Sequence, residues 1–268
     1  MQEQKLLSII TINYNNAAGL EKTILSVQSQ KQKCFEFIVI DGGSLDGSIG
    51  VIKKYEKDID RWVSEKDNGI YHAMNKGIGL AKGKYLFFLN GGDEFADDKS
   101  IEKISGCLNA NDIVYTNIRL IDEGIDFVKK YPEKLNFSFF YRDTLCHQAT
   151  FIKKSLFEKY GLYDETFKIS SDWKFLMDVI CKQNVSYKYC DMTLVNYSLD
   201  GLSSNPQNLQ RLNKERAQVF SEGYQAFMSD YDRMAEHENL LRRLGKSRAM
   251  KVILSLGFLK FFKVSKVS

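Results

Sequence analysis

Short apolar runs that end in polar turns recur through the first 117 residues. Five of these runs are rich in branched or aromatic residues, as buried strands are. The stretches between them carry apolar residues at helical spacing, such as Leu20, Ile24 and Val27 after Asn16, a residue type that caps helices. This alternation predicts an α/β fold with a mostly parallel central sheet and helices on both faces. The expected strands are residues 6–12, 35–40, 62–64, 85–89 and 112–117, and the expected helices follow Asn16 and Asp46 and span 70–81 and 101–108.

The pattern loosens after residue 117. Residues 122–140 are polar and aromatic without a clear period, whereas 147–151 look extended and 154–160 and 171–181 look helical. A long charged helical pattern then runs from 207 to 244. We expect one domain over residues 1–205, with halves at 1–117 and 118–205, followed by a C-terminal helical extension over 206–268.

The composition is that of an ordinary globular protein. Hydrophobic residues make up 44% and charged residues 27%, and only 2 prolines occur, which excludes disordered and fibrous classes. The net charge of +4 is uneven, because residues 201–268 hold 12 Lys/Arg and 6 Asp/Glu. No basic stripe interleaved with aromatic residues marks the rest of the chain, so we expect no nucleic-acid partner.

The cysteine spacing and the lengths of the apolar runs indicate the cellular compartment of the protein. The 5 cysteines form no C-x-x-C pair, which favours a reducing compartment and argues against a zinc ribbon or a disulfide scaffold. The first apolar run is too short for a secretory signal, and no stretch reaches the roughly 18 apolar residues of a membrane span. We therefore expect a cytoplasmic protein.

Two predicted strands deliver an acid to the edge of the sheet. Asp41 follows the strand at 35–40, and Asp93 follows the strand at 85–89. Because ligands bind beyond the carboxyl ends of parallel strands, these acids predict a pocket for a nucleotide and a metal. The first strand–helix turn, residues 13–19, lacks the dinucleotide fingerprint, and no P-loop occurs. A phosphate-bearing ligand would therefore need a metal ion for neutralisation.

Four motifs stand in order along the chain: Thr11-Ile12-Asn13-Tyr14-Asn15, Asp41-Gly42-Gly43-Ser44-Leu45-Asp46-Gly47, Glu65-Lys66-Asp67-Asn68-Gly69-Ile70-Tyr71-His72-Ala73-Met74-Asn75-Lys76-Gly77 and Asn90-Gly91-Gly92-Asp93. Their order and spacing resemble those of family 2 glycosyltransferases, over roughly residues 6–205, although any one alone would be weak. The resemblance implies a GT-A fold and a metal-dependent, inverting hexosyl- or N-acetylhexosaminyltransferase. It also implies a nucleotide-sugar donor, which we expect to be a UDP-sugar.

Donor contacts follow from the same resemblance. Asp41 would accept hydrogen bonds from the uracil or ribose, although Asp41 or Ser44 could instead cap a helix. Lys76 could offset phosphate charge as a point cation or be a solvated surface lysine. Asp67 belongs to an Asp-Asn-Gly stretch that is also a good turn sequence. The implied donor contacts are Thr11, Tyr14, Asp41, Asp67, Asn75 and Lys76.

Asp93 resembles the second acid of the family's D-x-D motif, which implies that it holds Mn²⁺ or Mg²⁺ against the diphosphate. Gly91 stands where the first acid belongs, so metal affinity without the nucleotide should be weak. Glu94 could assist or simply face solvent. Asp93 could also be a turn-forming residue after a strand.

Asp172, in Ser170-Ser171-Asp172-Trp173, resembles the acid that the family uses as catalytic base. It would take a proton from the attacking hydroxyl, with Asp164 and Glu165 as rival bases. In the alternative interpretation it only complements a helix dipole. Acceptor or diphosphate neighbours are expected from His147, Gln148 and Trp173, whose ring could stack on a sugar, while residues 197–203 resemble a donor-closing loop.

The C-terminal tail, residues 246–268, mixes apolar residues with 6 Lys/Arg and no acid. It could lie on an anionic membrane surface, or dock on the domain or on a second subunit of a homodimer. By resemblance, the acceptor is a glycan or a lipid-linked hydroxyl at the cytoplasmic face of a bacterial membrane, in polysaccharide biosynthesis. The rival of another class is a non-catalytic nucleotide-sugar-binding protein, its metal motif degraded at Gly91. A nucleotidyltransferase would need a Gly- and Arg-rich first loop, which residues 13–19 do not supply.

Overall fold

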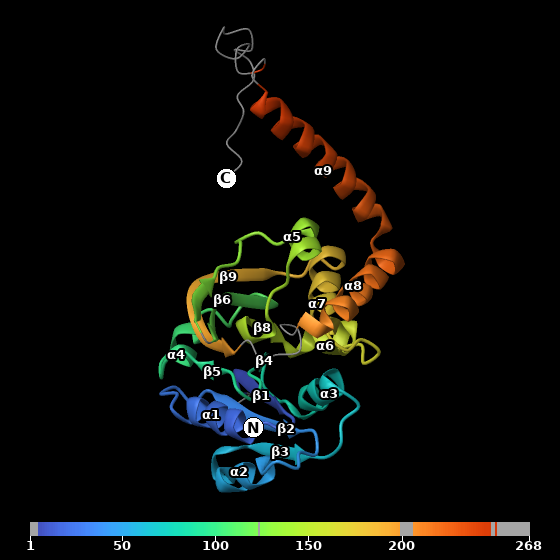
Figure 1. The fold of residues 1–268 in the computed structure, drawn as a ribbon. Helices are drawn as coiled ribbons and strands as arrows, with labels where there is room; N and C mark the ends of the chain where they lie inside the picture. Colours follow the sequence, from blue (N-terminus) through green and yellow to red (C-terminus); the bar gives the residue numbers. More distant parts are fainter. Residues whose placement is uncertain (1–4, 123, 199–205, 248–249, 251–268) are drawn as a thin grey trace. The chain divides into compact units, whose positions relative to one another are not determined.

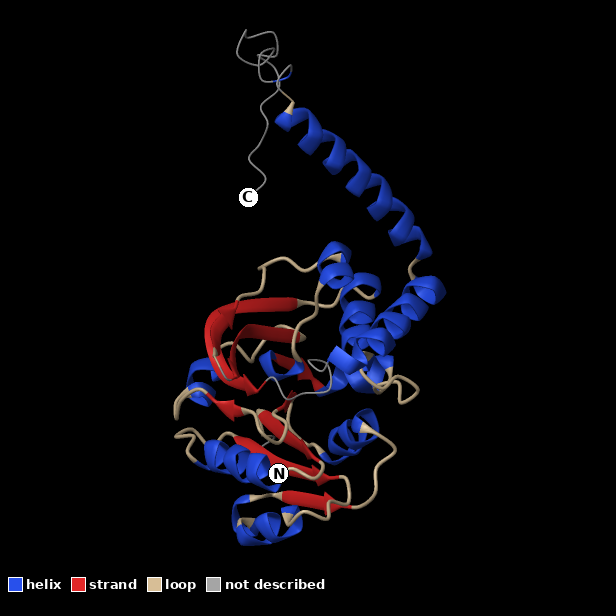
Figure 2. Cartoon of the chain, viewed as in Figure 1, coloured by secondary structure: helices blue, strands red, loops and turns tan. Residues whose placement is uncertain are grey.

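The computed structural model describes residues 5–122, 124–198, 206–247 and 250 (Figures 1 and 2). The chain divides into two compact units, the first ending at Ala217 and the second beginning at Gln218. This division falls inside a helix. The first residues of the expected C-terminal extension therefore belong to the first unit, together with the sheet.

Four parallel strands in the order β3-β2-β1-β4 form the first part of the sheet. Every residue of β1 and β2 is buried, which explains their continuous apolar character. The register pairs Asn13 of β1 with Asp41 of β2, and Asp41 with Ser64 of β3, so polar strand ends lie at one level. These strands are β1 (Leu7–Asn13), β2 (Phe35–Asp41), β3 (Arg61–Ser64) and β4 (Tyr85–Phe88).

Helices cover both faces of these strands. Side chains alternate along a strand, so Leu7 and Ile9 point to one face and Ile10 to the other. The first face packs in one core with α1, α2 and α4. On the other face Gly77 of α3 approaches Ile10 so closely that a Cβ on Gly77 would lie 2.5 Å from Ile10 Cγ2, which is why this position needs glycine. The helices are α1 (Ala17–Gln28), α2 (Ser48–Lys54), α3 (Ile70–Leu80) and α4 (Ser100–Ser105).

Antiparallel strands enter the second part of the sheet. β8 lies between β4 and β6 and runs antiparallel to both, so β4 and β6 point the same way. β9 pairs in parallel with β6, whereas β5 and β7 are antiparallel to β9 and β6. Among the described strands, β3, β2, β1, β4, β6 and β9 therefore share one direction, as a mostly parallel sheet requires. The strand bounds are β5 (Glu94–Phe95), β6 (Ile113–Asp122), β7 (Ile125–Lys129), β8 (Thr150–Lys153) and β9 (Tyr187–Ser198).

Three local expectations differ from the structure. The stretch expected to be extended from residue 147 begins as a 3-10 turn, and only then continues into β8. The helix expected over 171–181 is α7 as far as Met177, followed by a π-helical turn. The charged pattern over 207–244 is broken at Tyr224, directly after Gly223, a poor helix former. The remaining elements are α5 (Phe137–Arg142), α6 (Lys154–Tyr160), α7 (Ser171–Met177), α8 (Leu209–Gly223), α9 (Gln225–Lys246), the π-helical turn Asp178–Lys182 and the 3-10 turns Glu56–Asp58, His147–Ala149 and Pro206–Asn208.

Two expectations about the C-terminal third fall largely on residues that the structure does not describe. Residues 199–203 of the expected donor-closing loop lie outside the described residues, as does nearly all of the tail after Ser247. In the part of the chain that the structure describes, every helix is too short or too polar to span a bilayer.

Candidate active site

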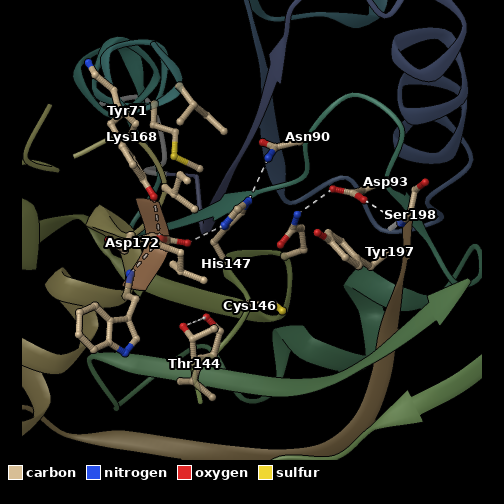
Figure 3. A pocket seen from close by; sticks show the side chains of 18 of the residues that line it. Tyr71, Asn90, Asp93, Thr144, Cys146, His147, Lys168, Asp172, Tyr197 and Ser198 are labelled. Carbon is tan, nitrogen blue, oxygen red and sulfur yellow. Dashed lines mark hydrogen bonds and ion pairs between the residues drawn. The ribbon is translucent and has the colours of Figure 1, made fainter. Parts of the chain in front are cut away.

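A cavity of about 330 Å³ opens where the loops after β1 and β4 meet the second part of the sheet (Figure 3). Its wall combines the start of α3, the loop after β4, the turn before β8, the start of α7, the end of β9 and the start of α8. Asp93 and Asp172 both line it, so the acids predicted for the metal and for the base share one cavity. Its other polar and charged lining residues are Asn16, Tyr71, Asn90, Thr144, Cys146, His147, Gln148, Lys168, Ser170, Trp173, Tyr197, Ser198 and Arg216.

Asp172 stands in the first turn of α7, where three groups hold its carboxylate. Tyr71 Oη donates to Oδ1 at 2.8 Å, Trp173 N donates to the same oxygen at 2.9 Å, and His147 Nδ1 lies 2.9 Å from Oδ2. Burial alone would raise the pKa of Asp172, but the contacts with His147 and Tyr71 outweigh it and hold this pKa below its ordinary value. The carboxylate is therefore ionised at neutral pH, oriented, and able to accept a proton.

His147 joins two sides of the cavity (Figure 3). Its Nε2 lies 2.9 Å from Asn90 Nδ2, in the loop after β4, and its Nδ1 contacts Asp172. The ring of Phe88 stands perpendicular to the imidazole with centroids 6.4 Å apart. These contacts fix the ring between β4 and α7.

Asp93 is 4% exposed, and its carboxylate accepts few hydrogen bonds from the described residues. Gln148 Nε2 donates to its Oδ2 at 3.0 Å, and the backbone N of Ser198 donates to Oδ1 at 3.3 Å. Burial raises the pKa of Asp93 to about 6, because these hydrogen bonds and the more distant charges of His147 and Lys22 only partly offset the desolvation. A cation placed beside this carboxylate would be stabilised by its poorly compensated charge.

The loop that carries Asp93 is fixed by its own backbone. Thr23 of α1 donates its hydroxyl to the carbonyl oxygen of Asp93 at 2.6 Å and accepts from Gly92 N at 3.0 Å. Gly92 has φ of +110°, a conformation that favours glycine. The local fold thus turns the Asp93 side chain into the cavity.

A preformed metal cage does not surround Asp93. The described residues contain no group of three or more His, Cys, Asp or Glu that could hold a metal ion. Glu94, considered as an auxiliary ligand, instead pairs with Lys22 at 3.2 Å. Asp93 is thus the one carboxylate of the loop after β4 that lines the cavity, which agrees with Gly91 standing where a first acid was expected.

Asp41 lies at the carboxyl end of β2 but outside the cavity wall, fully buried. Its oxygens accept hydrogen bonds from Asn13 Nδ2 at 2.9 Å, Ser64 Oγ at 2.7 Å, and both Ser44 N at 2.9 Å and Ser44 Oγ at 2.6 Å. Burial would raise the pKa of Asp41, and the hydrogen bonds from Ser44 and Ser64 lower it overall. In this structure Asp41 ties the loop after β2 to β1 and β3, and a donor contact by its side chain stays a prediction.

Thr11 and Asn75 are likewise engaged within the protein. The fully buried Thr11 hydroxyl donates to the carbonyl oxygen of Leu89 at 2.7 Å, which joins β1 to the end of β4. Asn75 Nδ2 donates to Tyr163 O and to Glu165 Oε1, both at 2.9 Å. Neither side chain lines the cavity. Both expected donor contacts stay predictions, and the contact with Asn75 places Glu165 in a scaffolding turn.

Tyr14, Gly42 and Asp67 meet next to the loop after β2. A Cβ on Gly42 would lie 3.1 Å from Tyr14 Cδ2 and 3.2 Å from Asp67 Oδ2. The Tyr14 side chain is 68% exposed, so its ring is available to a ligand. Lys76, predicted as a phosphate contact, pairs with Asp67 at 2.5 Å and with Glu65 at 2.8 Å, so its charge is already balanced.

Gln148 and Trp173 are in the cavity wall but hold other protein groups. Gln148 donates to Asp93, and Trp173 Nε1 donates to Phe140 O at 2.9 Å. Trp173 is only 2% exposed, and the guanidinium carbon of Arg216 lies 4.9 Å from its ring centroid. Trp173 is therefore almost fully buried beside Asp172, and a stacking contact between its ring and a sugar stays a prediction.

The start of α8 supplies site residues that sequence reasoning missed. Glu215 accepts hydrogen bonds from the backbone N of Lys168 at 2.8 Å, of Ile169 at 3.1 Å and of Ser170 at 3.0 Å. It thereby holds the segment that leads into α7 and Asp172, while Arg216 lines the cavity. The sequence shows these residues only as part of a charged helical pattern.

Solved structures with a similar fold are of the GT-A type, which shows the fold of this chain. Staphylococcus aureus TarS, residues 1–349, aligns with a TM-score of 0.60 and 15% identity, covering 81% of this chain and 72% of that chain. The mannosyltransferase PcManGT from Pyrobaculum calidifontis, solved with GDP-Man and Mn²⁺, aligns with a TM-score of 0.61 and 14% identity, covering 84% and 65%.

The chain belongs to glycosyl transferase family 2, whose model matches residues 8–200. An uncharacterised glycosyltransferase of Mycobacterium tuberculosis is 35% identical over 184 residues, which cover 66% of this chain and 70% of the relative. A PGL/p-HBAD biosynthesis glycosyltransferase of Mycobacterium bovis is 27% identical over 207 residues, which cover 75% and 79%. The predicted family and fold are thus confirmed.

Proposed function

We propose that this protein is an inverting, metal-dependent glycosyltransferase that moves a sugar from a nucleotide-sugar, a UDP-sugar in the first instance, to a hydroxyl group. The observation that carries the proposal is the convergence of Asp93 and Asp172 on one cavity. One carboxylate is poorly compensated and suited to a cation, and the other is ionised and suited to a proton.

The donor site would extend from the cavity toward Tyr14. A structure of TarS was solved in complex with UDP-GlcNAc; it aligns with a TM-score of 0.59 and 16% identity, covering 72% of this chain and 58% of that chain. Beside Gly42, the exposed ring of Tyr14 offers a face on which a nucleobase could stack, and the Asp67 carboxylate offers a hydrogen-bond acceptor for it. Asn16, which lines the cavity, lies between this face and the loop that carries Asp93.

Asp93 fits a divalent cation as a single ligand. Its desolvated carboxylate is a hard oxygen donor, and the other coordination positions would fall to diphosphate oxygens and water, as Mg²⁺ and Mn²⁺ prefer. When bound, such an ion offsets the negative charge that develops on the departing diphosphate. Gln148 and the Ser198 backbone orient the carboxylate for this contact.

Asp172 would act as general base. Its Oδ2 would receive the acceptor proton as the acceptor oxygen attacks the anomeric carbon, and attack opposite the diphosphate inverts that carbon. Tyr71 and His147 hold the carboxylate in place and keep it ionised before the transfer. Asp164 is a weaker candidate, because it does not line the cavity and its Oδ1 accepts from Thr166 Oγ1 at 2.6 Å.

A screen of nucleotide-sugars with Mn²⁺ tests the proposal. Release of nucleoside diphosphate, followed by mass spectrometry, should appear for one donor class and disappear with a chelator. Saturable donor binding without any turnover, in the presence of candidate glycan and lipid-linked acceptors, would contradict the enzyme and support a non-catalytic binding protein. The polysaccharide setting, and peripheral contact of residues 246–268 with the inner face of the membrane, are further parts of this proposal.

A further inference from the structure

Arg216 lines the cavity and makes no ion pair among the described residues. Its guanidinium lies over the Trp173 ring, and its Nε is buried without a hydrogen-bond partner in the described structure. Asp143 and Asp172 are the carboxylates that attract the Arg216 guanidinium most, but neither forms an ion pair with it among the described residues; Asp143 pairs with Lys129, and Asp172 contacts His147. Burial lowers the pKa of Arg216, although an arginine stays protonated at neutral pH. A desolvated, unpaired guanidinium stabilises an anion brought next to it.

Lys168 is a second cation on the same cavity, and it is exposed. Its Nζ approaches only backbone oxygens in the described structure, Glu165 O at 3.2 Å and Asn68 O at 3.4 Å. Figure 3 shows Lys168 with Tyr71 and Asp172, on the far side of His147 from Asp93. The positive charge thus collects on the side of the proposed base, away from the proposed metal ligand.

Glu215 fixes the two cations relative to each other. Its carboxylate accepts from the backbone N of residues 168, 169 and 170 and from Ser170 Oγ at 2.6 Å. The Glu215 carboxylate thus binds the segment that carries Lys168. Arg216 is the next residue after Glu215 on α8. This pairing keeps Lys168 and Arg216 on one wall without neutralising either.

We propose that Arg216 and Lys168 bind a phosphate-class anion on the acceptor, so that the enzyme selects acceptors that carry a phosphate or diphosphate group near the attacking hydroxyl. The inference rests on the proposed function, because it assumes that Asp172 is the base. A phosphate could also belong to the departing nucleoside diphosphate. The acceptor is the better source, because Arg216 packs on Trp173, the residue next to Asp172, and Lys168 lies across His147 from Asp93.

The test compares a charged with a neutral sugar probe. Binding of glucose 1-phosphate and of methyl glucoside is measured by ligand-observed NMR on the full chain, with saturating UDP and Mn²⁺. Wild type should prefer the phosphate by on the order of tenfold or more, and Arg216→Gln and Lys168→Gln should each remove most of that preference. The matched control is Arg233→Gln, which removes one charge from an exposed site on α9 and should leave the preference unchanged.

Two outcomes overturn the proposal. Equal binding of both probes by wild type, or an unchanged preference in Lys168→Gln, removes the acceptor-phosphate site. A loss of UDP affinity equal to the loss of phosphate preference assigns the cations to the donor instead. Because Arg216→Gln also removes the stack on Trp173, circular dichroism checks its fold, and the exposed Lys168 variant carries the test if that fold is lost. Failure of the proposed function would appear separately, as wild type that neither binds nor turns over any nucleotide-sugar.

Discussion

Asp41 and Asp93 both follow buried parallel strands, yet their surroundings differ. Asp41 is fully buried and receives hydrogen bonds from β1, β3 and its own loop, and its pKa is lowered overall. Asp93 is almost as buried but receives one side-chain and one backbone hydrogen bond, and its pKa is raised to about 6. The protein itself satisfies Asp41, whereas the charge of Asp93 is only partly compensated by its protein partners.

This contrast separates two kinds of motif residue. Side chains around Asp41, together with Thr11 and Asn75, make hydrogen bonds that hold the loops in position. Asp93 and Asp172 line the cavity instead, Asp93 with two hydrogen bonds from described residues and Asp172 with contacts to Tyr71, Trp173 N and His147. A motif therefore contains residues that hold the loops and residues that line the cavity, and the number of hydrogen bonds separates Asp41 from Asp93 in this respect.

Asp93→Asn should produce the largest change. Loss of the carboxylate removes the proposed cation contact, and we expect turnover of the donor found in the screen to fall by roughly 10³-fold, since a metal supplies several kcal/mol of charge stabilisation. Steady-state kinetics over a range of Mn²⁺ concentrations measure this. Glu94→Gln is the matched control, because Glu94 pairs with Lys22, and its turnover should stay within twofold of wild type. Equal losses in both variants would contradict the special place of Asp93.

Asp41→Asn should act on stability. The amide keeps the shape but loses the charge that Ser44, Ser64 and Asn13 stabilise, and hydrogen bonds to charged groups contribute about 1.5–3 kcal/mol each. We expect the free energy of unfolding to fall by about 3 kcal/mol in urea titrations. Asp98→Asn, at an exposed site, should change it by less than about 0.5 kcal/mol. An unchanged stability of Asp41→Asn, with weakened UDP binding, would make Asp41 a ligand contact.

In metal-free protein, the pH dependence of the free energy of unfolding should reveal the cost of burying the ionised Asp93 carboxylate. The unfolded carboxyl titrates near 3.9 and the folded one at about 6, so the folded state binds more protons between these values and loses stability as pH rises. Asp41 and Asp172, with lowered pKa values, act in the opposite direction at lower pH.

Comparison with Asp93→Asn isolates this effect. From pH 4.5 to pH 7, the stability of wild type relative to the variant should fall by about 2 kcal/mol, measured by urea unfolding at both pH values. If the difference in unfolding free energy between wild type and Asp93→Asn is the same at both pH values, burial does not raise the pKa of Asp93.

Glu215→Gln should have the smallest effect of these variants. It weakens the hold on residues 168–170 without touching the cavity acids, so we expect kcat to fall by about tenfold with the donor KM unchanged. Glu222→Gln, an exposed change on the same helix, is the control and should leave kcat unaltered. A change in thermal stability without a change in kcat would contradict this prediction and show that Glu215 has only a structural role.

The sequence predicts the first half of the fold well because its strands are buried and parallel, so each carries a local apolar signal. The insertion of β8 between β4 and β6, and the short β5 and β7, depend on pairing between distant residues. The turn at His147 is also set by tertiary contacts, which place its ring between Asn90 and Asp172.

The candidate site shows the same limit. Asp93 and Asp172 follow from motifs and occupy one cavity. Asn90 stands inside a recognised motif, but its contact with His147 has no signature in the sequence. Glu215 and Arg216 lie in a charged helical pattern that predicts only a solvated helix, because nothing local shows that α8 packs beside α7.

In the proposed reaction, Asp172 removes the acceptor proton in a cavity that also receives the donor. Calorimetric titration of Asp172→Asn with the UDP-sugar and Mn²⁺, paired with the rate of nucleoside diphosphate release, tests it most directly. The donor affinity of this variant should stay within twofold of wild type, and its rate should fall by about 10²–10⁴-fold, the range for loss of a general base. A variant that turns over at the wild-type rate would contradict it.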